Sequence, residues 1–219
     1  MVFHVLNRGV ARMKLFEKSA DYQAFEDVLG EMRDQSPMRI CTYSLMPNHW
    51  HLLLWPEHDG ELASFMQRLT ITHVRRWQED RGFSWLGHVY QGRYKSFPVE
   101  SDEHFWVVAR YVERNALRAQ LVVRAEEWRW SSLWRHSHGT AAERSLLAAW
   151  PIERPTDWVE RVDQTDNEKE LESLRQSVQR GRPFGQPQWQ KQIAKRLGLE
   201  SAFRPSGRPA KIGRSQRGP

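Results

Sequence analysis

The sequence predicts an α+β fold in which helices pack on a single sheet. Over residues 1–122, short stretches of alternating apolar residues are interspersed with longer stretches in which apolar residues recur every three or four positions. The resulting order is strand, helix, strand, strand, helix, strand, helix. The first six elements form a ferredoxin-like split βαβ sheet, and the seventh is an added helix. In this topology the first and third strands pair at the centre of the sheet.

Local signals mark the first half of this order. Residues 2–9 alternate and end in a glycine turn, and Ser19 can cap a helix whose apolar residues fall at helical spacing. Residues 38–46 are predicted to be the second strand. The Pro-Asn pair at 47–48 suits the central positions of a type I turn, which returns the chain as a third strand over residues 49–55.

The second half of the order contains two helices and one strand. A helix is predicted over residues 61–80, and a loop then leads to a fourth strand that ends near residue 99. Because Pro98 cannot donate a backbone hydrogen bond, this strand is expected at an edge of the sheet. The added helix is predicted over residues 101–122, with Ser101 as its N-cap.

Beyond the added helix we expect a helical, basic extension. Residues 126–136 are rich in aromatic residues and should pack back on the core, and amphipathic helices are predicted over residues 168–181 and 187–198. The Pro- and Gly-rich end, residues 203–219, is expected to be disordered when free. The predicted organisation is a ferredoxin-like domain over residues 1–135, a helical connector over 136–180 and a basic C-terminal tail over 181–219.

Positive charge is concentrated in this tail. Residues 175–219 contain eleven Lys and Arg residues against one acidic residue, Glu200, and so carry a net charge of +10. The whole chain carries +6, which leaves −4 on residues 1–174. A basic tail on a mildly acidic body is typical of proteins that bind polyanions, most often nucleic acid. A solvated tail that only aids solubility is the alternative.

Composition favours a cytoplasmic protein. The single cysteine, Cys41, excludes an intramolecular disulfide and fits a reducing compartment. No apolar run approaches the ~18 residues of a membrane span, and the N-terminal residues lack the plan of a signal peptide. We therefore expect no membrane partner, and we expect nucleoid association when DNA is bound.

Two histidines surround Trp50 at the start of the third strand. Because a strand repeats every two residues, His49 and His51 should leave one face while Trp50 and Leu52 leave the other. Two imidazoles on one face can bind one divalent cation, although metal sites normally use more than two ligands. Two histidine ligands favour Mn, Zn or Ni over Mg. A structural or solvated pair is the alternative.

The added helix offers further candidates. Tyr111 and Asn115 are four residues apart and should share one helix face. The carboxamide oxygen of Asn115 is a hard ligand that can complete a His-His-Asn set, which would leave Tyr111 to act on a group held by the metal. The alternatives are an ordinary aromatic residue of an amphipathic helix for Tyr111 and a helix-end residue for Asn115.

Four motifs carry a family resemblance: "MPNHWHLLL", "GRYKS", "ARYVERNALRAQLV" and "EWRWSS". Together they resemble the HUH single-strand DNA tyrosine transposases, and they are most similar to the REP-associated branch of that family. The resemblance covers residues 2–135, and the tail with "QRGRPFG" and "GRP" is similar to the same branch. Relatives often have "NPVRAGLV" where this chain has "NALRAQLV", a difference that could alter the end of the helix.

The resemblance implies a metal-dependent single-stranded DNA endonuclease and strand transferase, a transposase that acts at hairpin-bearing repetitive DNA. It implies Tyr111 as the nucleophile that forms a 5′-phosphotyrosine intermediate. His49, His51 and Asn115 would bind the metal, and Mg²⁺ or Mn²⁺ would be the cofactor. The sequence allows one other function. The protein could be a catalytically inactive regulatory module that binds hairpin or repeat DNA. Both a monomer and a homodimer remain open.

Five basic residues are candidates for contact with single-stranded or hairpin DNA. Arg93 and Lys95 alternate with tyrosines, a pattern suited to phosphate contact and base stacking, although a plain loop has the same composition. Arg180 and Arg182 in "RGRP" and Arg208 in "GRP" resemble the cores of AT-hooks, which enter narrow minor grooves.

Overall fold

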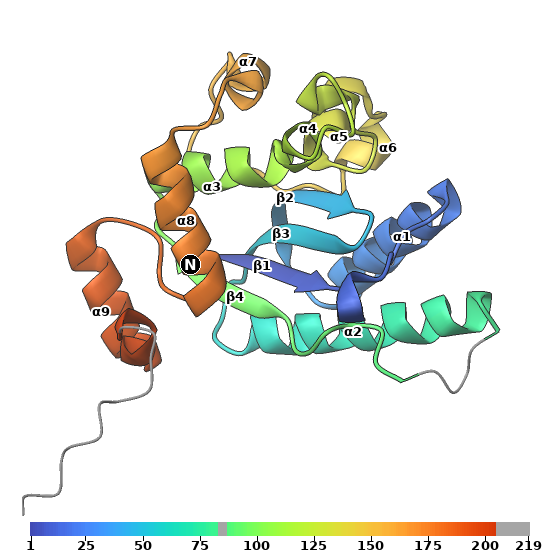
Figure 1. The fold of residues 1–219 in the computed structure, drawn as a ribbon, viewed down its shortest axis with the longest axis horizontal. Coiled ribbons are helices and arrows are strands. Elements are labelled where there is room, and N and C mark those ends of the chain that lie inside the picture. Colours follow the sequence, from blue (N-terminus) through green and yellow to red (C-terminus); the bar gives the residue numbers. More distant parts are fainter. Residues whose placement is uncertain (83–86, 205–219) are drawn as a thin grey trace, which may run out of the picture.

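A four-stranded antiparallel sheet forms the middle layer of the part of the chain that the structure describes, residues 1–82 and 87–204 (Figure 1). The structure is a computed structural model. The strands are β1 (Val2–Arg8), β2 (Arg39–Met46), β3 (His49–Trp55) and β4 (Lys95–Val99), in the order β2-β3-β1-β4. The α+β class and the central pairing of the first and third strands are confirmed. β4 lies at an edge, as Pro98 predicts.

The two faces of the sheet carry different side chains. Trp50 and Leu52 of β3 belong to a core cluster shared with the two helices α1 (Ser19–Gln35) and α2 (Glu61–Asp80). Leu53 belongs to a second cluster on the opposite face, which is shared with helix α3 (Glu103–Glu113). The alternation of β3 is therefore as predicted, and Leu53 packs on the face of the sheet that α3 covers. Figure 1 shows α3 lying over this face.

Helix α1 is capped differently from the sequence prediction. It begins at Ser19, so the N-cap position is Lys18 rather than Ser19. Instead the carboxylate of Asp21, in the first turn, accepts hydrogen bonds from the backbone N–H groups of Glu17 at 2.8 Å and Lys18 at 3.2 Å. A carboxylate satisfies the free N–H groups of a helix start and complements the helix dipole, which explains why it replaces the hydroxyl here.

A chain of polar contacts crosses the core between the sheet and α2. Trp50 Nε1 donates to the Tyr90 hydroxyl at 3.0 Å, and that hydroxyl lies 2.7 Å from Nδ1 of His73 on α2. The Tyr90 oxygen accepts from the indole and shares its second hydrogen bond with the His73 ring. All three side chains are buried, so their hydrogen bonds fix β3, α2 and residues 87–94 relative to one another.

Helix α3 covers the other face of the sheet. Its N-cap is Asp102, whose carboxylate accepts from the His104 N–H at 2.9 Å, rather than Ser101 as predicted. The helix is also shorter than predicted, because Arg114 interrupts it and the next turn is α4 (Asn115–Arg118). The chain keeps its direction through the interruption, since backbone N–H groups still bond four residues back at Arg114 and Arg118.

Buried Glu113 at the end of α3 fastens this helix to its surroundings. Its carboxylate accepts hydrogen bonds from Thr42 of β2 at 2.9 Å and from the Trp158 indole at 2.7 Å. It also accepts one from Ser132, the first residue of α5 (Ser132–His138). A buried carboxylate with several donors is electrostatically satisfied, so Glu113 holds the helix at a fixed position over the sheet.

The aromatic segment after α4 packs back on the core, as predicted. The indole of Trp128 donates to the Leu45 carbonyl oxygen at 2.9 Å, and Trp130 stacks on Tyr22 of α1. Short helices α6 (Ala141–Arg144) and α7 (Trp158–Asp163) follow. His136 and His138 both lie on helix α5.

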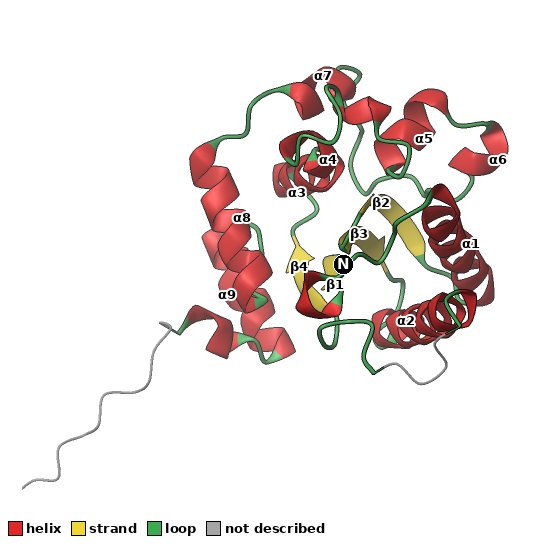
Figure 2. Ribbon diagram, turned by 45° about the vertical axis from the view of Figure 1, so that its right-hand side comes forward, coloured by secondary structure: helices red, strands yellow, loops and turns green. Residues whose placement is uncertain are grey.

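The C-terminal extension runs along the edge strand (Figure 2). Helices α8 (Glu168–Arg180) and α9 (Pro187–Leu197) form where predicted. α8 is capped by Gly181, whose φ of 70° is a left-handed conformation suited to glycine. Between them, Phe184 pairs with Val99 and its N–H bonds the Pro98 carbonyl at 2.9 Å. The edge of β4 is thereby covered. Among the described residues, no helix is both long and apolar enough to cross a membrane.

Candidate active site

Two histidines stand side by side at the start of β3, on the face that α3 covers. The ring centroids of His49 and His51 are 5.1 Å apart, and the rings are nearly perpendicular. His51 is buried at 3% exposure, whereas His49 is half-buried. Burial, followed by the charge of Arg8, lowers the pKa of His49 to about 4. Burial also lowers the pKa of His51, so both rings are neutral at neutral pH and have a lone pair to offer.

The turn residue before β3 fixes the first of these rings. Nδ1 of His49 lies 2.7 Å from the carboxamide oxygen of Asn48. Because that oxygen can only accept, the His49 proton is on Nδ1 and the lone pair is on Nε2. The sequence suggested Asn48 only as a turn residue, and its second role requires the hairpin to bring its side chain beside the ring.

A third histidine contacts the pair, and sequence reasoning missed it. His4 of β1 is fully buried, and its Nε2 lies 2.9 Å from Nδ1 of His51. The two rings are stacked with centroids 5.1 Å apart. The register explains the contact, because Leu6 pairs with His51 and His4 therefore sits diagonally across the same face. A single histidine in an alternating strand carries no signal of this kind, so only the pairing of β1 with β3 reveals it.

Tyr111 on α3 meets this histidine group. Its ring is edge-on to His51, with centroids 5.7 Å apart, and edge-on to His4 at 6.2 Å. The guanidinium of Arg118 lies over the Tyr111 ring, 4.5 Å from its centroid. Burial raises the pKa of the Tyr111 phenol, while the positive charges of Arg118, Arg175 and Arg8 oppose that rise. The negative charge of Asp166 adds to the rise in the Tyr111 pKa, so the hydroxyl is protonated at neutral pH, with both positive and negative charge nearby.

Asn115 opens α4, one turn after Tyr111. It is 9% exposed, and its Nδ2 has no hydrogen-bond partner in the described part of the chain. Helix α4 packs on β2, next to the strand that carries the two histidines. A buried amide N–H group without an acceptor costs free energy, so Asn115 is not placed there by hydrogen bonding of its amide nitrogen.

Two of these side chains offer ring nitrogens. Nδ1 of His49 and Nδ1 of His51 are both engaged, which leaves Nε2 of each ring, and a carboxamide such as that of Asn115 would ligate a cation through its oxygen. Imidazole nitrogens with a carboxamide oxygen suit a borderline-to-hard divalent ion. The two histidines also have the outer contacts that usually orient metal ligands, to Asn48 and to His4.

Three arginines flank Tyr111 along the same helical run. Arg114 and Arg118 approach the carboxylate of Asp166 at 3.3 and 3.2 Å, and Arg110 approaches it at 3.8 Å. Arg110 and Arg114 also donate to backbone carbonyl oxygens of residues 162–165 at 2.6–2.7 Å. The segment between α7 and α8 is thus held against the tyrosine-bearing helix by charge-assisted hydrogen bonds.

A second group of side chains, which no sequence pattern indicates, could hold a divalent cation. Ligand atoms of Glu100, Asp102 and His104 lie within 4.8 Å of one another. Each is already used in the fold: Asp102 caps α3 and contacts the His104 ring at 2.8 Å, and Glu100 accepts from the Gln186 N–H at 2.6 Å. Glu100 and Asp102 flank the junction between β4 and α3, where no spacing signal marks them.

The basic residues predicted to contact DNA lie in two places. Arg93 is exposed and, with Arg75 and Tyr94, lines a groove of about 850 Å³ between α2 and residues 87–94. Lys95 is exposed at the start of β4. A groove with both guanidinium groups and an aromatic ring has the chemistry for phosphate and base contact.

The tail residues lie beside the edge strand. Arg180 ends α8 and donates to the Arg204 carbonyl oxygen at 2.7 Å. Arg182 donates to the carboxamide oxygen of Gln190 at 2.9 and 3.0 Å and stacks on Phe203. In this arrangement Arg182 ties the loop to α9. Arg208 lies outside the described residues.

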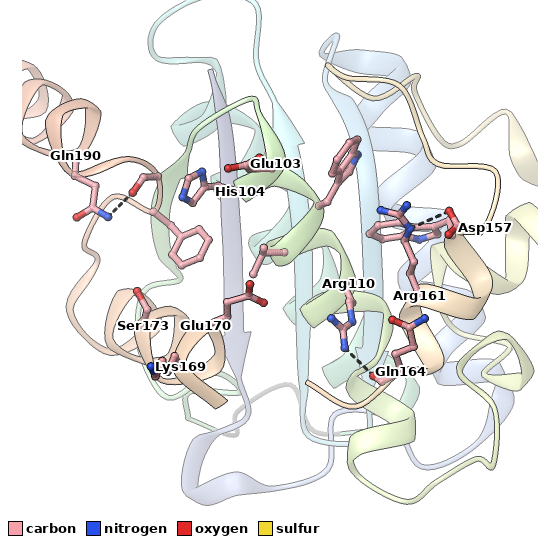
Figure 3. Close-up of a pocket in the computed structure, with 15 residues that line it drawn as sticks. Glu103, His104, Arg110, Asp157, Arg161, Gln164, Lys169, Glu170, Ser173 and Gln190 are labelled. Atoms are coloured by element: carbon pink, nitrogen blue, oxygen red, sulfur yellow. Dashed lines mark hydrogen bonds and ion pairs between the residues drawn. The ribbon is translucent and has the colours of Figure 1, made fainter. Parts of the chain in front are cut away.

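A cavity of about 800 Å³ lies on the outer side of α3, between α7 and α8 (Figure 3). Arg110, Arg161 and Lys169 contribute positive charge to its walls, and Glu103, Asp157 and Glu170 contribute negative charge. Arg161 is paired with Asp157 at 2.8 Å, and Arg110 with the Gln164 carbonyl oxygen at 2.7 Å. The cavity is separate from the histidine group, which lies on the sheet side of the same helix.

The comparison with family models gives the class of protein and its family. The model described as "Transposase IS200 like" matches residues 1–115, more than half of the chain. The chain therefore belongs to the IS200-like transposase family. No curated protein matches the sequence.

Two solved structures are similar to this one. One is a REP-associated tyrosine transposase bound to a REP hairpin; it is 17% identical, covers 76% of this chain and 85% of its own, and has a TM-score of 0.52. At this identity the likeness concerns the fold. The other is a candidate transposase from Deinococcus radiodurans, which is 19% identical, covers 52% of this chain and 88% of its own, and has a TM-score of 0.39.

Proposed function

We propose that this transposase is a metal-dependent endonuclease and strand transferase of single-stranded DNA. Tyr111 is the nucleophile, and His49, His51 and Asn115 hold Mg²⁺ or Mn²⁺. One observation carries the proposal. The Tyr111 ring lies edge-on to His51 at 5.7 Å, so a nucleophile from α3 and a ligand from β3 meet at one point.

The reaction follows from these residue types. The Tyr111 oxygen attacks the scissile phosphorus and forms a P–O bond, the bond from phosphorus to the 3′ oxygen breaks, and the phenol proton ends on that 3′ oxygen. The product is a 5′-phosphotyrosine and a free 3′-hydroxyl. Because the ester conserves the bond energy, attack by another 3′-hydroxyl reverses the step and joins strands. A bound cation would neutralise charge on the scissile phosphate.

Residues around Tyr111 and His49 would support this reaction. Arg118, Arg175 and Arg8 lower the cost of forming a phenolate on Tyr111 and attract the phosphate. Asn48 fixes the His49 tautomer that leaves Nε2 free. The Glu100, Asp102 and His104 group is the weaker candidate for the metal, because its ligand atoms already serve the cap of α3 and the 184–186 turn.

We propose hairpin-bearing repetitive DNA as the partner. The structural relative was solved with a REP hairpin, and this chain has a net charge of +10 over residues 175–219. Arg93 and Lys95 would contact single-stranded DNA, and the basic tail, including Arg180, Arg182 and Arg208, would contact the duplex stem. Such binding would associate the protein with the nucleoid. The proposed domain limits remain 1–135, 136–180 and 181–219.

The second candidate is a regulatory module that binds the same DNA without cutting it. The burial that raises the pKa of Tyr111 and the interruption of the helix at Arg114 favour this candidate. The two functions are separated by a labelled hairpin oligonucleotide with a single-stranded flank, incubated with Mn²⁺ and run on a denaturing gel. A protein-linked band that disappears with EDTA supports the transferase. Retention on a native gel with no linked band supports the module.

A further inference from the structure

The buried contact between His4 and His51 has a direct consequence for the metal site. Two neutral imidazoles that share one hydrogen bond have one proton between them, so either His4 Nε2–H donates to His51 or His51 Nδ1–H donates to His4. Only the second arrangement leaves a lone pair on Nε2 of His51, because a neutral imidazole carries its single proton on one nitrogen.

We propose that His4 is a positioning residue that accepts the Nδ1–H of His51 and thereby leaves Nε2 of His51 free to bind the cation. The inference rests on the proposed function, since it concerns the same metal. Asn48 does the same for His49 through its carboxamide oxygen. The two ligands would then present equivalent nitrogens, each fixed by a partner from another part of the fold.

The surroundings of His4 argue against a purely packing role. A fully buried histidine usually has both ring nitrogens partnered, yet Nδ1 of His4 has no hydrogen-bond partner in the described chain. The contact to His51 is therefore the one polar interaction of His4 that the described residues provide. A hydrophobic residue would fill the same space between Phe97 and Tyr111 at lower cost.

The proton positions balance without any external group. In the proposed arrangement His51 carries its proton on Nδ1 and donates it to Nε2 of His4, and His4 carries its own proton on Nδ1. In the reverse arrangement both protons are on Nε2. Each ring stays neutral throughout, so the two arrangements differ only in tautomer, and a ligand on Nε2 of His51 selects the first.

His4→Phe is the sharpest variant. Phenylalanine keeps a flat ring against Phe97 and Tyr111 and removes both nitrogens, whereas His4→Gln retains a carboxamide oxygen that can accept the His51 proton. His73→Phe is a matched control, because His73 is also buried and partnered by a hydroxyl but lies on the opposite face of the sheet. His49→Ala reports whether the histidine pair holds the metal at all.

The test is Mn²⁺ affinity of the full-length protein, measured from the free Mn²⁺ signal in electron paramagnetic resonance. Loss of an outer partner of a metal ligand typically costs 10–100-fold in affinity, so we expect about that loss for His4→Phe. We expect partial recovery in His4→Gln and no change in His73→Phe. A folded His4→Phe protein with wild-type affinity would overturn the role of His4.

A measurement on the unaltered protein keeps the proposal testable should His4→Phe not fold. Two-bond ¹H–¹⁵N correlation of histidine-labelled protein, saturated with diamagnetic Mg²⁺, reports the tautomer of each ring. We expect the Nδ1–H form for both His51 and His4, and the Nε2–H form for His51 would contradict the proposal. The metal site and the role of His4 are tested by different variants. If His49→Ala binds Mn²⁺ as the wild type does, the proposed metal site is wrong, and the role of His4 falls with it.

Discussion

The guanidinium of Arg118 lies 4.5 Å from the centroid of the Tyr111 ring, one helical turn beyond Asn115. Its charge opposes the rise in the Tyr111 pKa that burial causes. The same guanidinium also forms an ion pair with the carboxylate of Asp166, with an N–O distance of 3.2 Å. Arg118 is therefore placed to tune the acidity of the proposed nucleophile.

Replacing Arg118 should slow adduct formation and move its pH dependence. In Arg118→Gln the Tyr111 pKa rises further, so a smaller fraction of phenolate is present at each pH and the alkaline limb of the rate profile shifts to higher pH. We expect about tenfold slower adduct formation near neutral pH, as for a change of about 1.4 kcal/mol in the barrier. Arg124→Gln is the control, because Arg124 is exposed and pairs with Glu126. An unshifted profile in Arg118→Gln would show that its charge does not act on Tyr111.

The buried carboxylate of Glu113, which holds α3 on the sheet, should contribute to the free energy of unfolding. Glu113→Ala leaves the Thr42 and Ser132 hydroxyls and the Trp158 indole without their buried acceptor. Buried donors left unpaired cost about 1–3 kcal/mol, so we expect a loss of roughly 3 kcal/mol in the free energy of unfolding. Urea denaturation measures it, and Glu103→Ala, at an exposed position in the first turn of the same helix, should cost less than ~1 kcal/mol. Equal losses in both variants would show that the carboxylate of Glu113 is no anchor.

His73 makes stability sensitive to acid. Burial lowers its pKa to about 3, while the unfolded chain has the ordinary value of 6.5. The unfolded state therefore binds a proton first as pH falls, and stability is full above pH 6.5 and declines from there toward pH 3. At pH 5 the loss from this one residue is about 2 kcal/mol. In His73→Phe the melting temperature should fall less steeply between pH 7 and pH 5 than in the wild type. Parallel curves would contradict this assignment.

The structure sharpens the choice of a tail deletion. Removing residues from 180 onward would also remove Phe184, which covers the edge strand β4. Deletion of residues 205–219 instead leaves every described element and removes four basic residues. Each lost phosphate contact lowers the log–log salt slope of binding by roughly 0.7 on single strands and 0.9 on duplex. We expect a slope reduced by up to about 3 on hairpin DNA, measured by fluorescence anisotropy. An unchanged slope would place the DNA contacts elsewhere.

Much of the fold could be predicted from the sequence, because period-two and helical spacing are strong signals in long elements. The strands, the edge position of β4 and helices α8 and α9 were found in this way. The helix N-caps were harder to predict from the sequence. Asp21 and Asp102 replaced the predicted serines Ser19 and Ser101, since several polar residues near a helix start compete for the same N–H groups. The interruption at Arg114 has no sequence signal that we recognise.

The site was predictable only where spacing within one element decides it. His49 with His51, and Tyr111 with Asn115, share faces by strand and helix periodicity. His4 could not be found, because its contact depends on the register between β1 and β3. The same limit applies to Asp166, which meets Arg110, Arg114 and Arg118 through a connection that no local pattern specifies.

The central claim is that Tyr111 becomes covalently attached to DNA, and mass spectrometry of the adduct tests it most directly. The protein is incubated with Mn²⁺ and a hairpin oligonucleotide, digested with protease and nuclease, and searched for a peptide that carries a 5′-linked nucleotide. We expect the nucleotide on the peptide that contains Tyr111, no adduct in Tyr111→Phe, and a normal adduct in the matched control Tyr94→Phe. DNA affinity of Tyr111→Phe should match that of the wild type. A nucleotide on Tyr94 or any other residue, or an adduct that persists in Tyr111→Phe, would contradict the account.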